Sequence, residues 1–109
     1  MPIKSRVRDG VTILDLNGKI GDTALRQAIH EALGAGAAKI LLNFSGVAVN
    51  GWPEIGALVE AYTVATNRGA KLKIANLPPG INDDILYVTQ LITIFDVFDS
   101  EDEAVKSFA

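Results

Sequence analysis

The segment from Asn50 to Ile55 is the part of the chain where residue types and spacing most suggest a functional site. It follows the mainly apolar run 40–44 and includes the start of a helical pattern at Pro53. Such a strand-to-helix junction is where an open α/β sheet usually presents its functional groups. Between positions 41 and 59, however, Glu54 is the only charged residue, and both His and Cys are absent. This composition indicates a contact surface and not a reaction centre.

Two side chains of this segment have distinctive chemistry. The indole of Trp52 either closes the edge of the core or forms an exposed aromatic anchor for a protein partner. The carboxylate of Glu54 either complements the dipole in the first turn of a helix or imitates the charge of a phosphorylated residue. The candidate partner-binding residues are therefore Asn50, Gly51, Trp52, Pro53, Glu54 and Ile55.

Other residues that could bind a metal or a nucleotide do not form a recognisable motif. An acidic cluster near the C-terminus lacks the ligand spacing of a calcium loop and is typical of a solvated helix start. Its members are Asp96, Asp99, Glu101, Asp102 and Glu103. His30 is the only histidine and cysteine is absent, so a zinc site is not expected. Gly46, Gly51 and Gly56 fit neither phosphate-binding fingerprint. We expect no catalytic residue, no metal and no cofactor.

Length and composition predict one folded domain over residues 1–109. The chain is 49% hydrophobic and 21% charged, which is typical of a globular protein. A formal net charge of −3 argues against binding to a nucleic-acid backbone. Neither a signal peptide nor a stretch of about 18 apolar residues is present, so we expect no membrane association and a cytoplasmic location.

Hydrophobic periodicity predicts the elements that must position the 50–55 segment. The expected order is strand, strand, helix, strand, helix, strand, helix, strand, helix. The corresponding spans are 3–7, 11–16, 22–33, 39–44, 53–67, 72–77, a helix after Asn82, 95–98 and 101–108. This alternation predicts an α/β fold with a mixed, mostly parallel sheet of four to five strands and about four helices.

Side chains at two helix starts fit capping roles. Asp22 or Thr23 is expected to cap the first helix. Ser100, followed by Glu103, has the spacing of a capping box and predicts the start of the terminal helix.

Four motifs occur along the chain in a defined order and spacing. They are Leu41–Val47, Ile55–Leu58, Gly69–Leu72 with Ala75–Leu77, and Ile94–Val105. This arrangement resembles the STAS domain of bacterial anti-sigma-factor antagonists and extends from about Val11 to Phe108. The resemblance implies a STAS-like fold and a non-enzymatic switch. In that family, an anti-sigma factor that is also a serine/threonine kinase binds the antagonist and phosphorylates a serine at the start of the helix after the central strand.

The chain departs from this family at the phosphorylation site. Without gaps, the usual Asp-Ser-Ser-Gly falls on Gly51-Trp52-Pro53-Glu54, and none of these residues accepts phosphate from such a kinase. We therefore expect a phosphorylation-deficient module of transcription regulation in bacteria. Its expected partner is an anti-sigma factor or related kinase, contacted through this turn and the solvent face of the next helix. On that face, charge specificity would come from Glu60, Asn67 and Arg68.

Two alternatives remain open from the sequence. The first is a scaffold subunit that forms homo-oligomers through its sheet edge or its helices. The second is a small α/β enzyme or ligand-binding protein. Since no nucleophile, base and orienting group stand together, only a deep polar pocket would favour the second alternative.

Overall fold

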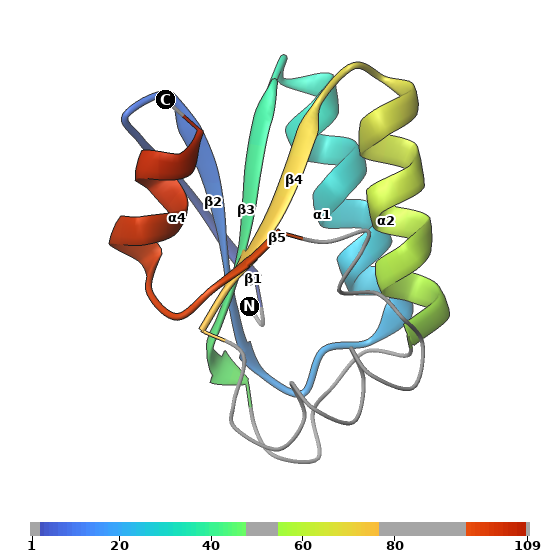
Figure 1. Ribbon diagram of the computed structural model, residues 1–109. Coiled ribbons are helices and arrows are strands. Elements are labelled where there is room, and N and C mark those ends of the chain that lie inside the picture. Colours follow the sequence, from blue (N-terminus) through green and yellow to red (C-terminus); the bar gives the residue numbers. More distant parts are fainter. Residues whose placement is uncertain (1–2, 48–54, 77–95, 109) are drawn as a thin grey trace.

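The computed structural model of the protein describes residues 3–47, 55–76 and 96–108 (Figure 1). Along the chain, the elements are β1 (Ile3–Arg8), β2 (Val11–Gly18), α1 (Asp22–Gly34), β3 (Lys39–Val47), α2 (Ile55–Asn67), β4 (Lys71–Ala75), β5 (Asp96–Phe98) and α4 (Glu101–Ser107). The predicted α/β order is confirmed for this part of the chain. The helix expected after Asn82 lies outside the described residues.

The sheet has five strands in the order β1-β2-β3-β4-β5. β1 runs antiparallel to β2, while β2, β3, β4 and β5 are parallel to one another. The mixed, mostly parallel sheet expected from the sequence is therefore confirmed. β3 is the central strand of this sheet, and its residues Ile40 to Phe44 are all buried, as expected for a strand covered on both faces. The carboxyl ends of β2, β3 and β4 consequently meet at one edge of the sheet.

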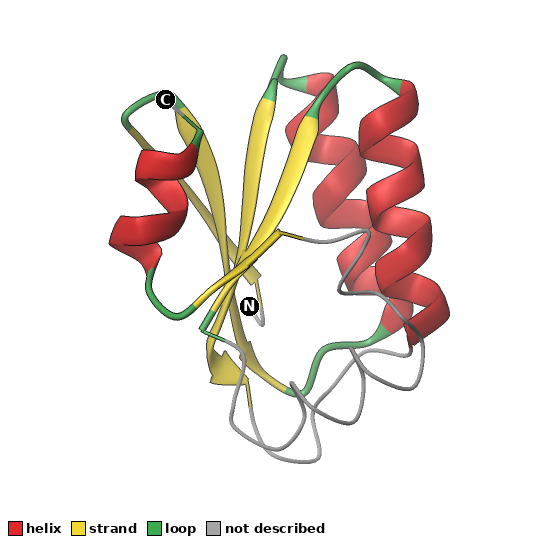
Figure 2. Cartoon of the chain, in the orientation of Figure 1, coloured by secondary structure: helices red, strands yellow, loops and turns green. Residues whose placement is uncertain are grey.

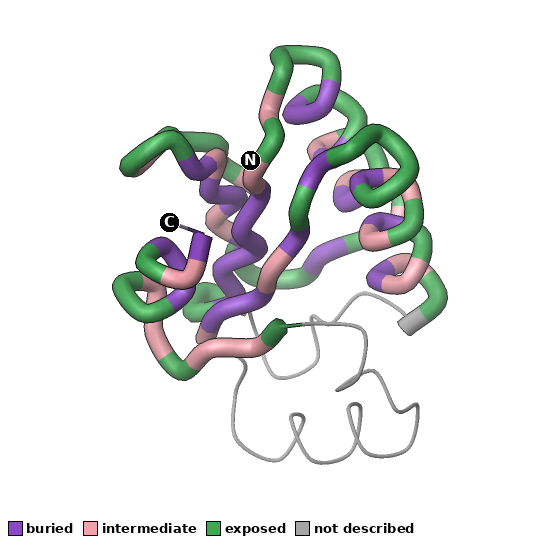
Figure 3. The backbone as a smooth tube through the Cα atoms, turned by 45° about the horizontal axis from the view of Figure 1, so that its top comes forward, coloured by how far each residue is buried: buried purple, intermediate pink, exposed green. Residues whose placement is uncertain are grey.

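Helices cover both faces of the sheet. α1 and α2 lie side by side on one face, and α4 lies on the opposite face (Figure 2). Side chains alternate along β3, so that Leu42 and Phe44 belong to the core shared with α1 and α2. Leu41 belongs to a separate small core with Phe108, next to α4. The strands that lie between the helices accordingly contain many of the buried residues (Figure 3).

The N-cap residue of helix α1 is a glycine. It is Gly21, which has no side chain to form a capping hydrogen bond, so the prediction that Asp22 or Thr23 is the N-cap residue is wrong. Asp22 lies inside the first turn, where its carboxylate complements the helix dipole. The helix ends near the predicted position, and Gly36 then takes a φ of 91°.

Strand β3 extends further than the sequence indicated. The predicted strand ends at residue 44, but β3 continues through Ser45 and Gly46 to Val47. The physical reason is pairing with β2: Gly46 lies opposite Asn17 after a local register shift in the β2–β3 ladder. β2 is correspondingly longer than expected, because Asn17 remains in the strand.

Strand β4 is shorter at its end than expected. It stops at Ala75, and Asn76 adopts a φ of 62°. This left-handed conformation is incompatible with a continuing strand, and asparagine is one of the residues that tolerate it.

Among the described residues, no helix is long and apolar enough to cross a membrane.

Helix α4 is capped at its start and held to the sheet at its end. At its start, the Ser100 hydroxyl accepts a hydrogen bond from the Glu103 amide at 3.2 Å, as the capping motif predicted. At its end, the Lys73 ammonium donates to the Ser107 carbonyl at 3.1 Å and to its hydroxyl at 2.9 Å. The same ammonium lies 4.7 Å from the centre of the Phe108 ring. Lys73 therefore joins β4 to the end of the chain.

Replacing Lys73 with methionine is expected to lower the free energy of unfolding by about 1 to 3 kcal/mol, because hydrogen bonds from a largely buried cation are lost. The side chain of Lys73 is only 12% exposed. Urea titration measures the change. Lys71 is an exposed lysine on the same strand, so Lys71→Met is the matched control and should stay within about 0.5 kcal/mol of wild type. Equal effects of the two substitutions would contradict this account.

Candidate interaction site

The carboxyl ends of the parallel strands form an exposed polar edge. This carboxyl edge consists of Asn17, Gly18, Ser45, Gly46, Val47 and Asn76. The first four of these residues are exposed. Because α1 follows β2 and α2 follows β3, both helices begin at this edge (Figure 1). The edge therefore combines exposed polar side chains with accessible backbone.

The partner-binding residues expected from the sequence fall largely outside the described part of the chain. This applies to Asn50, Gly51, Trp52, Pro53 and Glu54. Ile55 is the first residue of α2. On the other side, Val47 is the last residue of β3. The flanking residues thus belong to the strand and the helix that the sequence predicted around the segment, and the binding role stays a prediction.

Gly46 permits a close approach between β2 and β3 at the carboxyl edge. A Cβ atom at this position would lie 2.1 Å from Oδ1 of Asn17 and 3.0 Å from the Leu16 carbonyl oxygen. Any larger side chain would therefore displace Asn17 or the strand backbone. Glycine at position 46 thus allows the Asn17 side chain to lie across the end of β3.

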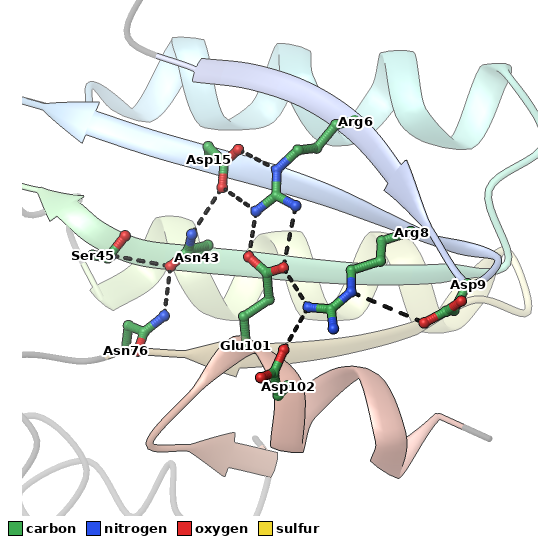
Figure 4. Close-up of polar contacts among 9 residues, drawn as sticks. All are labelled: Arg6, Arg8, Asp9, Asp15, Asn43, Ser45, Asn76, Glu101 and Asp102. Atoms are coloured by element: carbon green, nitrogen blue, oxygen red, sulfur yellow. Dashed lines mark hydrogen bonds and ion pairs between the residues drawn. The ribbon is translucent and has the colours of Figure 1, made fainter.

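A row of polar contacts begins at Asn43, on the same face of the sheet as α4 (Figure 4). Its Nδ2 donates to Oδ1 of Asp15 at 2.8 Å. Its Oδ1 accepts from the Ser45 amide at 3.2 Å and from Nδ2 of Asn76 at 2.9 Å. These bonds join β2 and β3 to the residue that follows β4. The row therefore connects the sheet interior with the carboxyl edge.

Arg6 continues this row toward helix α4. Its guanidinium donates to both carboxylate oxygens of Asp15, at 2.6 and 3.1 Å, and to both oxygens of Glu101. Arg8 adds a hydrogen bond to Glu101 at 2.7 Å and an ion pair with Asp102 at 2.7 Å. Two arginines of β1 thus hold the start of α4 against the sheet.

These contacts lower the pKa of both central carboxyls. For Asp15, the hydrogen bond from Arg6 lowers the pKa most, partial burial opposes the shift, and the hydrogen bond from Asn43 adds to it. For Glu101, the hydrogen bond from Arg6 is again the largest cause, with that from Arg8 adding to it. Both groups are therefore held in the carboxylate form, in which they only accept hydrogen bonds.

Replacing Arg6 with glutamine is expected to weaken the dependence of stability on acidity. Because the folded-state pKa values of Asp15 and Glu101 are lowered, their contribution is present above the ordinary carboxyl pKa of about 4 and is lost as the pH falls through the folded-state values. The free energy of unfolding should therefore drop less between about pH 7 and about pH 2.5 than in wild type. Since Arg6 is 42% exposed, the difference should stay below about 1 kcal/mol.

Lys19 provides the control for this experiment. It is an exposed cation that follows β2, so Lys19→Gln should keep the wild-type pH profile. If the Arg6→Gln protein has the same pH dependence of the free energy of unfolding as wild type, the ion pairs of Arg6 do not contribute to that dependence.

Two of the three side chains expected on the solvent face of α2 lie there. Glu60 and Asn67 are exposed residues of α2, whereas Arg68 is exposed but directly follows the helix, which ends at Asn67. Glu60 also accepts hydrogen bonds from Arg26 of α1, at 2.9 and 3.2 Å. The Glu60 carboxylate is thus paired with Arg26 and joins the two helices. Asn67 and Arg68 are therefore the better candidates for contacts with a partner.

The residues considered for metal binding in the sequence lie on the exposed surface or in the first turn of α4. His30 is exposed, as expected. Glu101, Asp102 and Glu103 lie in the first turn of α4, the helix start that the sequence indicated. Within the described ranges, no group of three or more His, Cys, Asp or Glu side chains could hold a metal ion.

A groove of about 660 Å³ lies between β1 and α1, away from the carboxyl edge. Small apolar residues such as Ala24 and Ala28 line it, together with Val7, which is 72% exposed. Glu31 is the one ionisable group among the lining residues. The groove is therefore not the deep polar pocket that would favour an enzyme.

Comparison with known sequences and structures defines the family. The STAS domain sequence model matches residues 2–104. The chain belongs to the STAS domain family. No match was found among curated proteins.

Several solved structures share the fold of this STAS domain. An anti-sigma factor antagonist from Mycobacterium paratuberculosis is 17% identical, with a TM-score of 0.76 over 96% of this chain and 91% of the other. An anti-sigma-factor antagonist domain protein from Planctomyces limnophilus is 18% identical, with a TM-score of 0.71 over 96% of both chains. The phosphorylated Bacillus cell fate determinant SpoIIAA is 17% identical, with a TM-score of 0.71 over 98% and 99%. At these identities, the likeness establishes the fold alone.

The sequence did not reveal the polar row of this STAS domain. Asp15, Asn43 and Asn76 are far apart in the chain, and although Asn43 and Asn76 lie in motifs that resemble the STAS family, those motifs did not predict contacts between the three side chains. One local signal was available: Asn43 interrupts the apolar run of the inner strand. Because a buried amide needs hydrogen-bond partners, a polar residue in such a strand indicates nearby polar groups. The identity of those groups depends on strand pairing.

Proposed function

We propose that this protein is a non-enzymatic interaction module of the anti-sigma-factor antagonist type, acting in bacterial transcription regulation. The proposed partner is an anti-sigma factor or a related serine/threonine kinase. The proposed contact surface comprises Asn50 to Ile55, the carboxyl edge and the outer face of α2. Recognition alone would perform the function, without transfer of phosphate to the turn.

The replaced phosphorylation motif is the observation that carries this proposal. In a STAS domain, the residues between β3 and α2 here read Gly51-Trp52-Pro53-Glu54 where the family usually has Asp-Ser-Ser-Gly. Trp52 supplies an aromatic group of the kind enriched at binding hot spots, whereas a hydroxyl that could accept phosphate is missing. The exposed polar edge beside this segment supports a role in docking.

The test uses the anti-sigma factor kinases encoded in the same genome. The purified protein is expected to form a stoichiometric complex with one of them, and mass spectrometry after incubation with Mg-ATP should detect no phosphate at residues 51–54. The matched control restores the family motif by Gly51→Asp, Trp52→Ser, Pro53→Ser and Glu54→Gly, and should accept phosphate. Failure of wild type to bind any of these kinases would contradict the proposal.

Phosphate elsewhere on the chain would change the proposal in a defined way. Hydroxyl groups that could accept phosphate include those of Ser45, Thr63, Thr66 and Ser100. Stoichiometric phosphorylation at one of them would show that the module is still switched covalently. The Ser100 hydroxyl already accepts the capping hydrogen bond of α4, and the Thr63 hydroxyl donates to the Val59 carbonyl at 2.9 Å.

The groove between β1 and α1 favours one second candidate function, the binding of a small apolar ligand. Its volume of about 660 Å³ lies within the range of small-molecule sites, and its lining is mainly apolar. Saturable binding of the neutral dye Nile red, lost in Ala28→Phe but kept in Ala57→Phe on α2, would support this function. Absence of saturable binding to wild type would reject it.

A further inference from the structure

Asn43 is the one buried polar residue among those that the structure describes, with 7% exposure. Burial of a carboxamide is unfavourable unless its donor and acceptor atoms are hydrogen-bonded. Its position is also unusual, because it lies within the apolar run of the inner strand, between Leu42 and Phe44. The contacts of this side chain therefore need an explanation beyond packing.

All contacts of the Asn43 side chain lead toward the carboxyl edge or toward the group that orients the amide (Figure 4). Oδ1 receives two donors, the backbone amide of Ser45 at 3.2 Å and Nδ2 of Asn76 at 2.9 Å. Ser45 lies near the end of β3, and Asn76 directly follows β4. One oxygen atom thus holds the ends of two neighbouring strands.

Asp15 determines which way the carboxamide points. Its carboxylate accepts from Nδ2 of Asn43 at 2.8 Å and is itself held by Arg6. A flipped carboxamide would place its oxygen against the carboxylate and its NH2 group against two donors. Because every contact would then be unfavourable, only one orientation satisfies the site. The oxygen is consequently directed at Ser45 and Asn76.

We propose that Asn43 is a positioning residue for partner docking: its carboxamide, oriented by Asp15, fixes the Ser45 backbone and the Asn76 side chain and so sets the shape of the carboxyl edge. This inference rests on the proposed function, because it assigns the edge to a docking surface. It deepens that function by naming the interior residue on which the geometry of the surface depends.

The main test compares Asn43→Asp with the double variant Asp15→Asn/Asn43→Asp. The single substitution places two carboxylates in contact, so one of them should hold a proton to an unusually high pH. The Ser45 amide resonance should then follow that titration in 15N NMR. In the double variant, a donor and an acceptor face each other again with unchanged total charge. The rate of amide hydrogen exchange at Ser45, which should differ from wild type in Asn43→Asp, should therefore lie within about threefold of the wild-type rate in the double variant.

Asn76→Gly tests the contact from the other side with little risk to folding. Glycine readily adopts the φ of 62° that Asn76 has, so the substitution removes the donor without straining the backbone. Because the Asn43 carboxamide then loses one of the contacts that hold it in place, hydrogen exchange of the Ser45 amide should accelerate. Amides in the core of α1 should keep their wild-type exchange rates. Asn67→Asp, on the exposed face of α2, should leave Ser45 unchanged.

Binding measurements separate this inference from the proposed function. Asn43→Asp should weaken binding of the anti-sigma factor at least tenfold, and the double variant should restore most of the affinity. Unchanged Ser45 exchange in all folded variants, or an altered Ser45 with wild-type affinity, would overturn the positioning role. A wild-type protein that binds no anti-sigma factor would overturn the proposed function, while the NMR result at Ser45 would stand.

Discussion

Replacing Phe44 with alanine is expected to lower the free energy of unfolding by about 3 to 5 kcal/mol, the usual cost of removing a fully buried aromatic side chain. Phe44 has 0% exposure and lies in the core between β3 and the helix pair α1 and α2. The substitution leaves a cavity that the surrounding strands cannot close. This is a large part of the total stability of about 5 to 15 kcal/mol that small domains have. Denaturant titration followed by circular dichroism measures the loss.

Val7→Ala is the control for Phe44→Ala. Val7 is 72% exposed, so its truncation should change the free energy of unfolding by no more than about 0.5 kcal/mol. A similar, small effect at both positions would contradict the placement of Phe44 in the core. Because Phe44 directly precedes Ser45, the alanine variant should also show faster amide exchange at the carboxyl edge.

Replacing Trp52 with alanine is expected to weaken binding of the proposed partner, an anti-sigma factor, at least tenfold, or about 1.4 kcal/mol, since tryptophan is prominent among interface hot spots. The free energy of unfolding should fall by less than about 1 kcal/mol if the indole contacts the partner and not the core. Isothermal titration calorimetry and urea titration provide the two measurements.

The two interpretations of Trp52 give opposite results in this experiment. A large loss of stability with unchanged affinity would mean that the indole closes the core and does not bind a partner. Val7→Ala again serves as control, because Val7 lies on β1 opposite Thr12, in the half of the sheet away from the carboxyl edge. The affinity of the Val7→Ala protein for the proposed partner should equal that of wild type.

The order of the elements could be predicted from the sequence because it depends on local patterns. The uninterrupted apolar run from Ile40 to Leu42 indicated a strand covered on both faces, and β3 is that inner strand. Apolar residues at helical spacing predicted α1 and α2. The capping pair Ser100 and Glu103 predicted the start of α4, and the structure confirms that contact. Each of these signals lies within a few neighbouring residues.

Element boundaries at the carboxyl edge were harder to predict. Ser45 and Gly46 have turn-forming side chains, yet both lie in β3 because β2 offers them a pairing partner. Gly21 is the N-cap residue of α1, although Asp22 and Thr23 are better capping residues. In both cases, local preference differs from the observed structure, and pairing between distant segments accounts for the longer β3.

The sequence by itself determined the α/β fold, the membership in the STAS domain family and the replacement of the usual phosphorylation motif, because these follow from patterns and motifs in the chain. Only the tertiary structure decided that Arg6, Asp15, Asn43 and Asn76 form one row of contacts that reaches the carboxyl edge. These residues belong to different strands or strand ends, and their contacts depend on strand order and register. Hydrogen bonds act over about 3 Å, so partners distant in sequence become visible only when the sheet has brought them together.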